Sequence, residues 1–134
     1  MENNIVVSGK RKTSVAKATI KSGKGIVTIN KRPISLLPYL QQLEINEPLV
    51  IAKDVLGKLD FDIEVKVVGG GIASRIEAAR LAIARAIVKF TNNEDLKGAY
   101  LIYDRNLLVA DTRRKEAYKP GDSKARSMRQ SSKR

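Results

Sequence analysis

Residues 61–90, FDIEVKVVGGGIASRIEAARLAIARAIVKF, join a strand pattern directly to a helix pattern. In residues 61–68 apolar and charged side chains alternate, which is typical of a strand with one buried face. From Ile72 to Phe90 apolar side chains recur every three or four residues, which predicts a long helix with one apolar face. A strand followed so closely by a helix favours a helix that packs across a sheet.

The segments on either side extend this mixed pattern. Residues 4–10 and 14–21 have the short alternating character of strands, and residues 26–29 (IVTI) follow the turn sequence SGKG. We therefore predict a hairpin between 14–21 and 26–29.

Three further segments favour helices. Residues 36–43 suggest a short helix interrupted at Pro38, and Asn46-Glu47-Pro48 has the composition of a helix start, with Gly57 as the stop. NNEDL, residues 92–96, places acids in the first turn of another short helix. The chain is thus expected to be an α+β protein with helices on one face of a mainly antiparallel sheet.

Charge is unevenly distributed along the 134 residues, which carry a net charge of +12. Residues 1–32 and residues 113–134 each sum to +7, while residues 33–112 sum to −2. The last twelve residues, SKARSMRQSSKR, hold five Lys or Arg and very little apolar surface, so they have little to bury. We expect a globular domain over residues 1–112 and an extended basic tail over 113–134. Segregated positive charge indicates an anionic partner, most commonly nucleic acid.

Composition argues against several other classes. The chain has no Cys and no His, which removes disulfides, thiolate metal sites and the commonest general base. Its carboxylates form no pairing that suggests acid–base catalysis. No signal pattern is present, and the longest uncharged run has eleven residues, 33–43, too few to span a bilayer. We expect a cytoplasmic protein that is not an enzyme, needs no cofactor or metal and does not bind membranes.

Two local motifs are candidate RNA contacts. The turn Gly69-Gly70-Gly71 precedes a helix, where exposed backbone N–H groups bind phosphate well, and Arg75 lies one helical turn further on. The alternative is a purely structural role, a tight connection where the helix crosses closely over the sheet. The second motif is GKRKTS, residues 9–14, which places Lys10, Arg11 and Lys12 between two strands.

Three stretches together resemble the ninth small-subunit ribosomal protein in its archaeal–eukaryotic form. They are GKRKTSVAKATIKSGKGIVTINKRP, then GGGIASRIEAARLAIARAI, and finally YDRNLLVADTRRKEAYKPGDSKARSMRQSSKR. The triple glycine before the helix and the terminal Arg-Gln-x-Ser-Lys-Arg are the most specific parts. Arg75 stands where the family usually has Gln, and Ser127 and Met128 make the tail less arginine-dense than in many relatives.

The resemblance implies a four-stranded sheet with a left-handed βαβ crossover, against the usual hand. It also implies a place in the head of the small ribosomal subunit, in contact with ribosomal RNA and neighbouring head proteins. The residues it assigns to ribosomal RNA are Lys10, Arg11, Lys12, Gly69, Gly70, Gly71, Arg75, Arg113, Arg114, Lys115, Lys124, Arg126 and Arg129.

The tail has a further implied partner. In the family its last residues, here Lys133 and Arg134, reach transfer RNA in the peptidyl site. Residues 119–134 could extend up to ~50 Å at about 3.3 Å per residue. Two alternatives stay open at this point: a nucleotide-binding phosphotransfer domain that uses the Gly69–Gly71 loop, and a free RNA chaperone.

Overall fold

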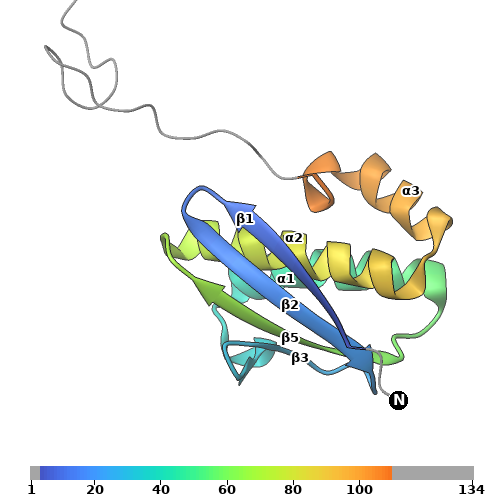
Figure 1. The fold of residues 1–134 in the computed structure, drawn as a ribbon, viewed down its shortest axis with the longest axis horizontal. Helices are drawn as coiled ribbons and strands as arrows, with labels where there is room; N and C mark the ends of the chain where they lie inside the picture. The colour runs from blue at the N-terminus through green and yellow to red at the C-terminus, as the bar shows by residue number, and fades with distance from the viewer. Residues whose placement is uncertain (1–3, 110–134) are drawn as a thin grey trace, which may run out of the picture.

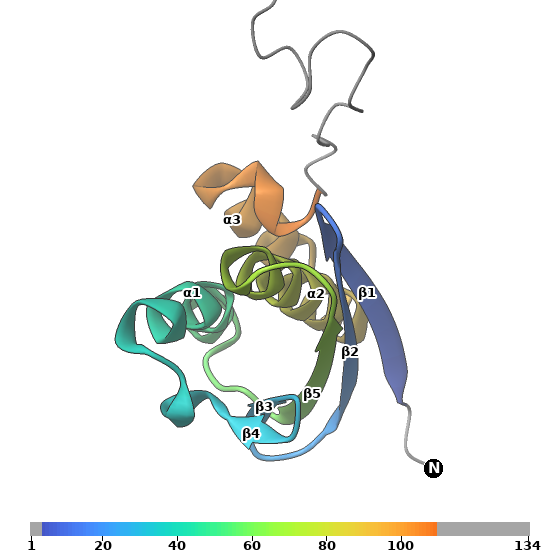
Figure 2. The same cartoon turned by 90° about the vertical axis from the view of Figure 1, so that its left-hand side faces the viewer.

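The computed structural model describes residues 4–109. The elements are β1 (Ile5–Arg11), β2 (Ser14–Ser22), β3 (Val27–Ile29), β4 (Arg32–Pro33), the 3-10 turn η1 (Ile34–Leu36), α1 (Tyr39–Leu56), β5 (Phe61–Val68), α2 (Ile72–Thr91), α3 (Glu94–Tyr103) and the 3-10 turn η2 (Arg105–Leu107). The strands form one mixed sheet in the order β1-β2-β5-β3-β4. Helices α1 and α2 cover one face of it (Figures 1 and 2). The predicted α+β class with helices on one face is confirmed.

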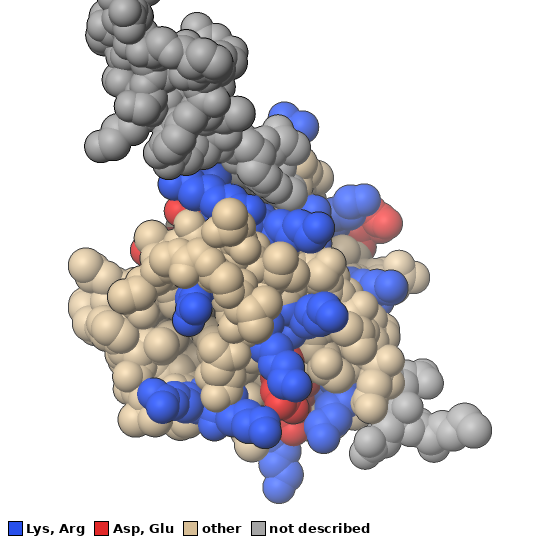
Figure 3. Space-filling model, turned by 60° about the vertical axis from the view of Figure 1, so that its left-hand side comes forward, with Lys and Arg blue, Asp and Glu red and all other residues tan. Residues whose placement is uncertain are grey.

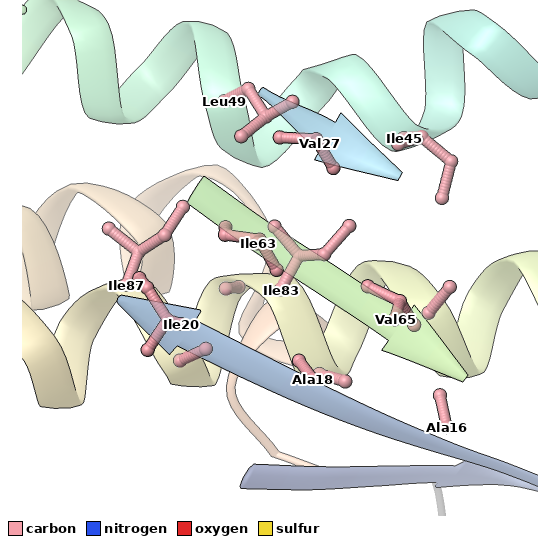
Figure 4. Close-up of a cluster of buried hydrophobic side chains, with 14 of the residues drawn as sticks. Ala16, Ala18, Ile20, Val27, Ile45, Leu49, Ile63, Val65, Ile83 and Ile87 are labelled. Atoms are coloured by element: carbon pink, nitrogen blue, oxygen red, sulfur yellow. The ribbon is translucent and has the colours of Figure 1, made fainter. Parts of the chain in front are cut away.

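The core lies between the sheet and these two helices. The alternation in residues 61–68 is confirmed, because every second residue of β5 from Phe61 to Val67 is buried. Figure 4 shows the labelled side chains of β2, β5 and α2 meeting in one layer, with Val27 of β3 and two residues of α1 beside them. Fully buried Ile83 and Ile87 supply the α2 side of this layer.

Small residues allow α2 to approach β1 and β2 closely. Gly9 in β1 is buried, and a Cβ there would lie 2.7 Å from the Ala78 carbonyl oxygen and 2.8 Å from the Ala82 nitrogen. Its partner in β2, Ala16, is fully buried, as is Ala18. No side chain fits between Gly9 and the helix backbone, so the distance between α2 and this edge of the sheet is set by backbone contact.

The predicted hairpin between residues 14–21 and 26–29 is wrong. Strand β2 pairs antiparallel with β1 and with β5, where Ser22 faces Phe61. Strand β3 lies on the far side of β5 and runs parallel to it, with Val27 opposite Ile63. The sheet therefore has five strands, not four, if the two-residue β4 is counted, and it contains a parallel pair joined through α1.

Asp62 provides the physical reason for this pairing. Its carboxylate accepts hydrogen bonds from the backbone N–H groups of Lys24, Gly25 and Ile26, at 2.9, 3.2 and 3.0 Å. The loop after β2 is thereby held across the start of β5, which carries the chain past β5 instead of back along β2. These hydrogen bonds, with that of Ile26 the largest cause, lower the pKa of Asp62 below its ordinary value.

The helix predictions need two corrections. The short helix predicted over residues 36–43 is not a separate element, because its first residue closes η1 and residues 39–43 form the start of α1. Helix α1 begins at Tyr39, not at Asn46, and it continues through Pro48 to end at Gly57 as predicted. Pro38 occupies the N-cap, where a missing N–H costs nothing. Burial of Ile45, Leu49 and Ala52 keeps the helix intact around Pro48.

The short helix predicted at NNEDL is confirmed as α3. The Asn93 side chain caps its start by accepting a hydrogen bond from the Leu96 N–H at 3.1 Å.

Gly9→Ala should destabilise the fold, because the added Cβ would press on the backbone of α2. We expect a loss of about 1–3 kcal/mol in the free energy of unfolding, measured in urea. Gly98→Ala in α3 is the matched control, since a Cβ there meets nothing within 4 Å. It should instead raise stability by about 0.5–1 kcal/mol. Equal effects of the two substitutions would contradict the close packing of α2.

Asp62→Asn should lower stability at neutral pH by weakening the acceptor for three N–H groups. The folded pKa of Asp62 lies below its unfolded value, so its contribution is present above about pH 4 and is lost as the pH falls through the folded pKa. The stability gap between wild type and variant should therefore close on acidification. Urea midpoints between pH 7 and pH 2.5 measure this gap, and a pH-independent gap would argue against the mechanism.

Candidate nucleic-acid interface

The β1–β2 turn and the glycine loop, far apart in sequence, pack against each other at one end of the sheet. The Ser14 hydroxyl donates to the Gly69 carbonyl oxygen at 2.9 Å. A Cβ on Gly69 would lie 2.6 Å from the Thr13 carbonyl oxygen, and one on Gly70 would lie 2.0 Å from Ser14 Oγ. Both glycines also have positive φ, 79° and 70°. Gly69 and Gly70 therefore serve as a tight connection, which was the structural alternative considered for this motif.

Gly71 differs from its two neighbours. A Cβ on Gly71 would meet nothing within 4 Å, and the residue is the N-cap of α2 with no side chain capping the helix. The first turn of α2 contains no acid. Free N–H groups and the positive end of the helix dipole make such a terminus favourable for a phosphate.

Of the three arginines in α2, Arg75 is the one that lies exposed at the glycine-loop end of the helix. Its Nε donates to the Gly69 carbonyl oxygen at 3.0 Å. The other two arginines of α2 hold the fold together. Arg80 pairs with Glu47 of α1 and lies 3.4 Å from Asp104, and Arg85 donates to the carbonyl oxygens of Leu108 at 2.8 Å and Ser8 at 3.1 Å.

The three cations of the β1–β2 turn likewise include one that is bonded within the fold and two that are exposed. Arg11 donates through Nε to Glu77 and so ties the turn to α2. Lys10 and Lys12 are exposed. Lys12 has a φ of 53°, a left-handed conformation that non-glycine residues seldom adopt. A strained residue held at the tip of a basic turn is a pattern found at functional sites.

Sequence reasoning missed lysines on the outer face of the sheet. Lys17 of β2 lies directly opposite Lys66 of β5, and both are exposed. Like charges opposite each other destabilise a sheet unless an anion lies between them. Lys10 is on the same outer face, because its partner Val15 is two residues from Lys17. The alternation of apolar and polar residues along the strands indicated that these lysines face outward. Because the sequence analysis paired residues 14–21 with 26–29, it did not predict that β2 pairs with β5.

A second missed group lies in the β3–β4 turn. The Asn30 side chain accepts from the Val67 N–H at 2.9 Å, which fixes this turn two residues before Gly69. The exposed Lys31 and Arg32 follow directly. We call the resulting area the basic surface; it consists of Lys10, Lys12, Lys17, Lys31, Arg32, Lys66, Gly71 and Arg75. With this end of the molecule turned forward, Lys and Arg recur across the surface and acids show at few points (Figure 3).

Other kinds of site find no support in the part of the chain that the structure describes. Between residues 4 and 109 no three acidic side chains gather into a possible metal site. None of the helices there has the length and apolar character needed to cross a bilayer. A small α+β domain with exposed lysines, an arginine and an uncapped helix terminus at one end of its sheet belongs to the class of proteins that bind a nucleic-acid backbone.

Comparison with known proteins identifies the family. The sequence matches the ribosomal protein S9/S16 family over residues 9–134. A relative from Methanococcus maripaludis, named small ribosomal subunit protein uS9, is 47% identical over 116 residues, which cover 86% of this chain and 85% of that protein. The protein of the same name from Methanococcus vannielii is 45% identical over equal shares. The chain belongs to the ribosomal protein S9/S16 family, which confirms the resemblance and the expectation of a non-enzymatic ribosomal protein.

The remaining predicted site residues lie outside the described residues 4–109. They are Arg113, Arg114, Lys115, Lys124, Arg126, Arg129, Lys133 and Arg134. The boundary expected at residue 112 lies there as well.

Substitutions in the glycine loop distinguish the packed Gly70 from the open Gly71. Gly70→Ala should cost at least about 1–3 kcal/mol of stability, through the clash with Ser14 Oγ and the positive φ. Gly71→Ala should change stability by less than about 0.5 kcal/mol, because the position is open. Thermal unfolding of both variants measures this difference. Equal melting temperatures would contradict the packing of Gly70 on the turn.

Proposed function

We propose that this protein is a structural constituent of the small ribosomal subunit and that its basic surface binds ribosomal RNA. The observation that carries the proposal is the meeting of the turn at residues 10–13 with the loop at residues 69–71 in a chain of this family. The names of its relatives support the subunit assignment. Mechanistically, the rigid end presents lysines at fixed spacing, and these lysines displace the cations condensed on the phosphates of folded RNA.

The finer assignments belong to the same proposal. The protein lies in the head of the subunit beside other head proteins, and residues 113–134 extend through RNA so that Lys133 and Arg134 contact transfer RNA in the peptidyl site. Charge supports this: residues 113–134 sum to +7, and arginine binds phosphate bidentately. The parallel pairing of β3 and β5 requires a crossover, which runs through α1, and the resemblance to the family is the support for proposing that it is left-handed.

Neither alternative is favoured. A phosphotransfer site at the Gly69–Gly71 loop would need room for a nucleotide, but Thr13 and Ser14 fill the space beside Gly69 and Gly70. A free RNA chaperone would bind unfolded RNA as readily as folded RNA. Co-sedimentation with small subunits after a high-salt wash separates the ribosomal role from the chaperone role.

Binding to small-subunit ribosomal RNA should depend steeply on salt. With about six to ten phosphate contacts, affinity should fall by about 10³–10⁵ between 50 and 200 mM salt. The double variant Lys10→Gln/Lys12→Gln should lower the slope of log affinity against log salt by about 2, one for each lost contact. Filter binding at several salt concentrations measures the slope.

The matched control for that experiment is Lys53→Gln/Lys97→Gln, which removes the same charge from α1 and α3. This control should leave the slope within about half a unit of wild type. If both double variants change the slope equally, net charge rather than the basic surface drives binding.

Deleting Lys133 and Arg134 tests the role of the tail. The subunit should still assemble, because the basic surface is intact. Transfer RNA should dissociate faster from the peptidyl site, since each lost phosphate contact is worth at most ~1.5–3 kcal/mol. Dissociation rates from purified subunits measure this loss. A wild-type rate, with the shortened protein verified in the subunits, would rule out the contact.

A further inference from the structure

The outer side of α1 is unusual for this chain because it has little positive charge, Lys53 being the single cation of the helix. Residues 33–52 contain no Lys or Arg, although the chain has 26 of them. Within this stretch α1 buries Ile45, Leu49 and Ala52 against the sheet. At about 100° per residue, Tyr39, Leu43 and Val50 lie on the opposite side.

That opposite side is apolar as well. Tyr39 is 72% exposed, Val50 is 57% exposed and Leu43 is 45% exposed. A surface helix normally has a polar outer face, and a helix that is apolar on both sides is normally covered on both. In Figure 3 the area over α1, at the left of the view, is largely free of charged side chains.

A hollow lies next to this exposed face of α1. Leu43, Asn46, Glu47, Val50 and Ile51 of α1, with Tyr103 of α3, line a space of about 410 Å³. We call the exposed face of α1 together with this hollow the α1–α3 surface. No cation lines the hollow itself, although the exposed Lys53 lies one helical turn after Val50, and Arg80 is paired with Glu47. An exposed apolar area of this kind with a polar rim marks a protein-binding site.

The charges around the α1–α3 surface restrict its partner. Glu44 and Asp54 are exposed on α1 against the single cation Lys53, and Glu94 and Asp95 are exposed at the start of α3 beside Lys97. Acids therefore outnumber cations around this surface. RNA phosphate would be repelled here, and a second copy would bring acids against acids. The chain's own residues 113–134 are basic, but they offer few apolar side chains to fill the hollow.

We propose that the α1–α3 surface docks a neighbouring ribosomal protein through a segment that is both apolar and basic. Apolar side chains of that segment fill the hollow beside Val50, and its Lys or Arg residues face Glu44 and Asp54. This inference rests on the proposed place of the protein in the ribosome. It divides the molecule into an RNA side, the basic surface, and a protein side on α1 and α3.

Opposite charges at one position test the chemistry of the partner. Val50→Lys and Val50→Asp are each co-expressed with wild type, and the ratio of variant to wild type is measured in purified small subunits. We expect Val50→Lys to be depleted about tenfold relative to Val50→Asp, because a new cation would face a basic segment. Both variants should fold, as unchanged thermal unfolding would verify, because Val50 is mostly exposed. Stronger depletion of Val50→Asp would indicate RNA on this face, and equal ratios would contradict a basic partner.

Photo-cross-linking identifies the occupant directly. A benzophenone amino acid at position 50, in intact small subunits, should cross-link to a peptide of another ribosomal protein that contains apolar residues beside Lys or Arg. Cross-links to RNA, to a second copy, to this chain's own residues or to nothing would each overturn the inference. The same probe at Ser8, exposed on the outer face of the sheet, should cross-link to RNA. Failure at Ser8 alone would count against the proposed RNA surface and not against the α1–α3 surface.

Discussion

The backbone contact between α2 and β1 at Gly9 is the constraint on which the rest of the structure depends. A Cβ at Gly9 would lie within 3 Å of two backbone atoms of α2, so the helix crosses the sheet at a fixed, minimal distance. That distance brings the loop before α2 down onto the β1–β2 turn. Ser14 then donates to Gly69, and Arg11 reaches Glu77. Two segments more than fifty residues apart thus form one rigid end.

In the function proposed here, the rigid end is what lets a protein of modest size recognise folded RNA. Exposed lysines on flexible loops would lose conformational freedom on binding, whereas Lys10, Lys17 and Lys66 project from a paired sheet. Arg80 and Arg85 do not contribute to RNA binding in this account, because they bond to Glu47 and to the Leu108 carbonyl oxygen within the fold. The opposite layer differs, because the outer side of α1 is largely apolar and carries more acids than cations. Charge is therefore the basis for our proposal that the two sides of the molecule have different partners.

Much of this arrangement could be predicted from the sequence, because β5 and α2 have strong and different periodicities. Gly57 and the NNEDL segment marked helix boundaries correctly, since their local chemistry acts alone. The hairpin prediction failed because strand pairing depends on a distant group, Asp62, which binds three N–H groups of the loop after β2. That error concealed the opposition of Lys17 and Lys66. The start of α1 was misplaced because tertiary burial outweighed the helix-breaking tendency of Pro48.

The central claim is that the basic surface is the side that faces RNA, and lysine acetylation tests it most directly. Free protein and intact small subunits are treated with an amine-reactive reagent, and modification at each lysine is followed by mass spectrometry. In subunits, Lys10, Lys12, Lys17 and Lys66 should be protected, while Lys58, which lies away from the basic surface, should react nearly as in the free protein. Equal reactivity of the first four lysines in both states would contradict the account.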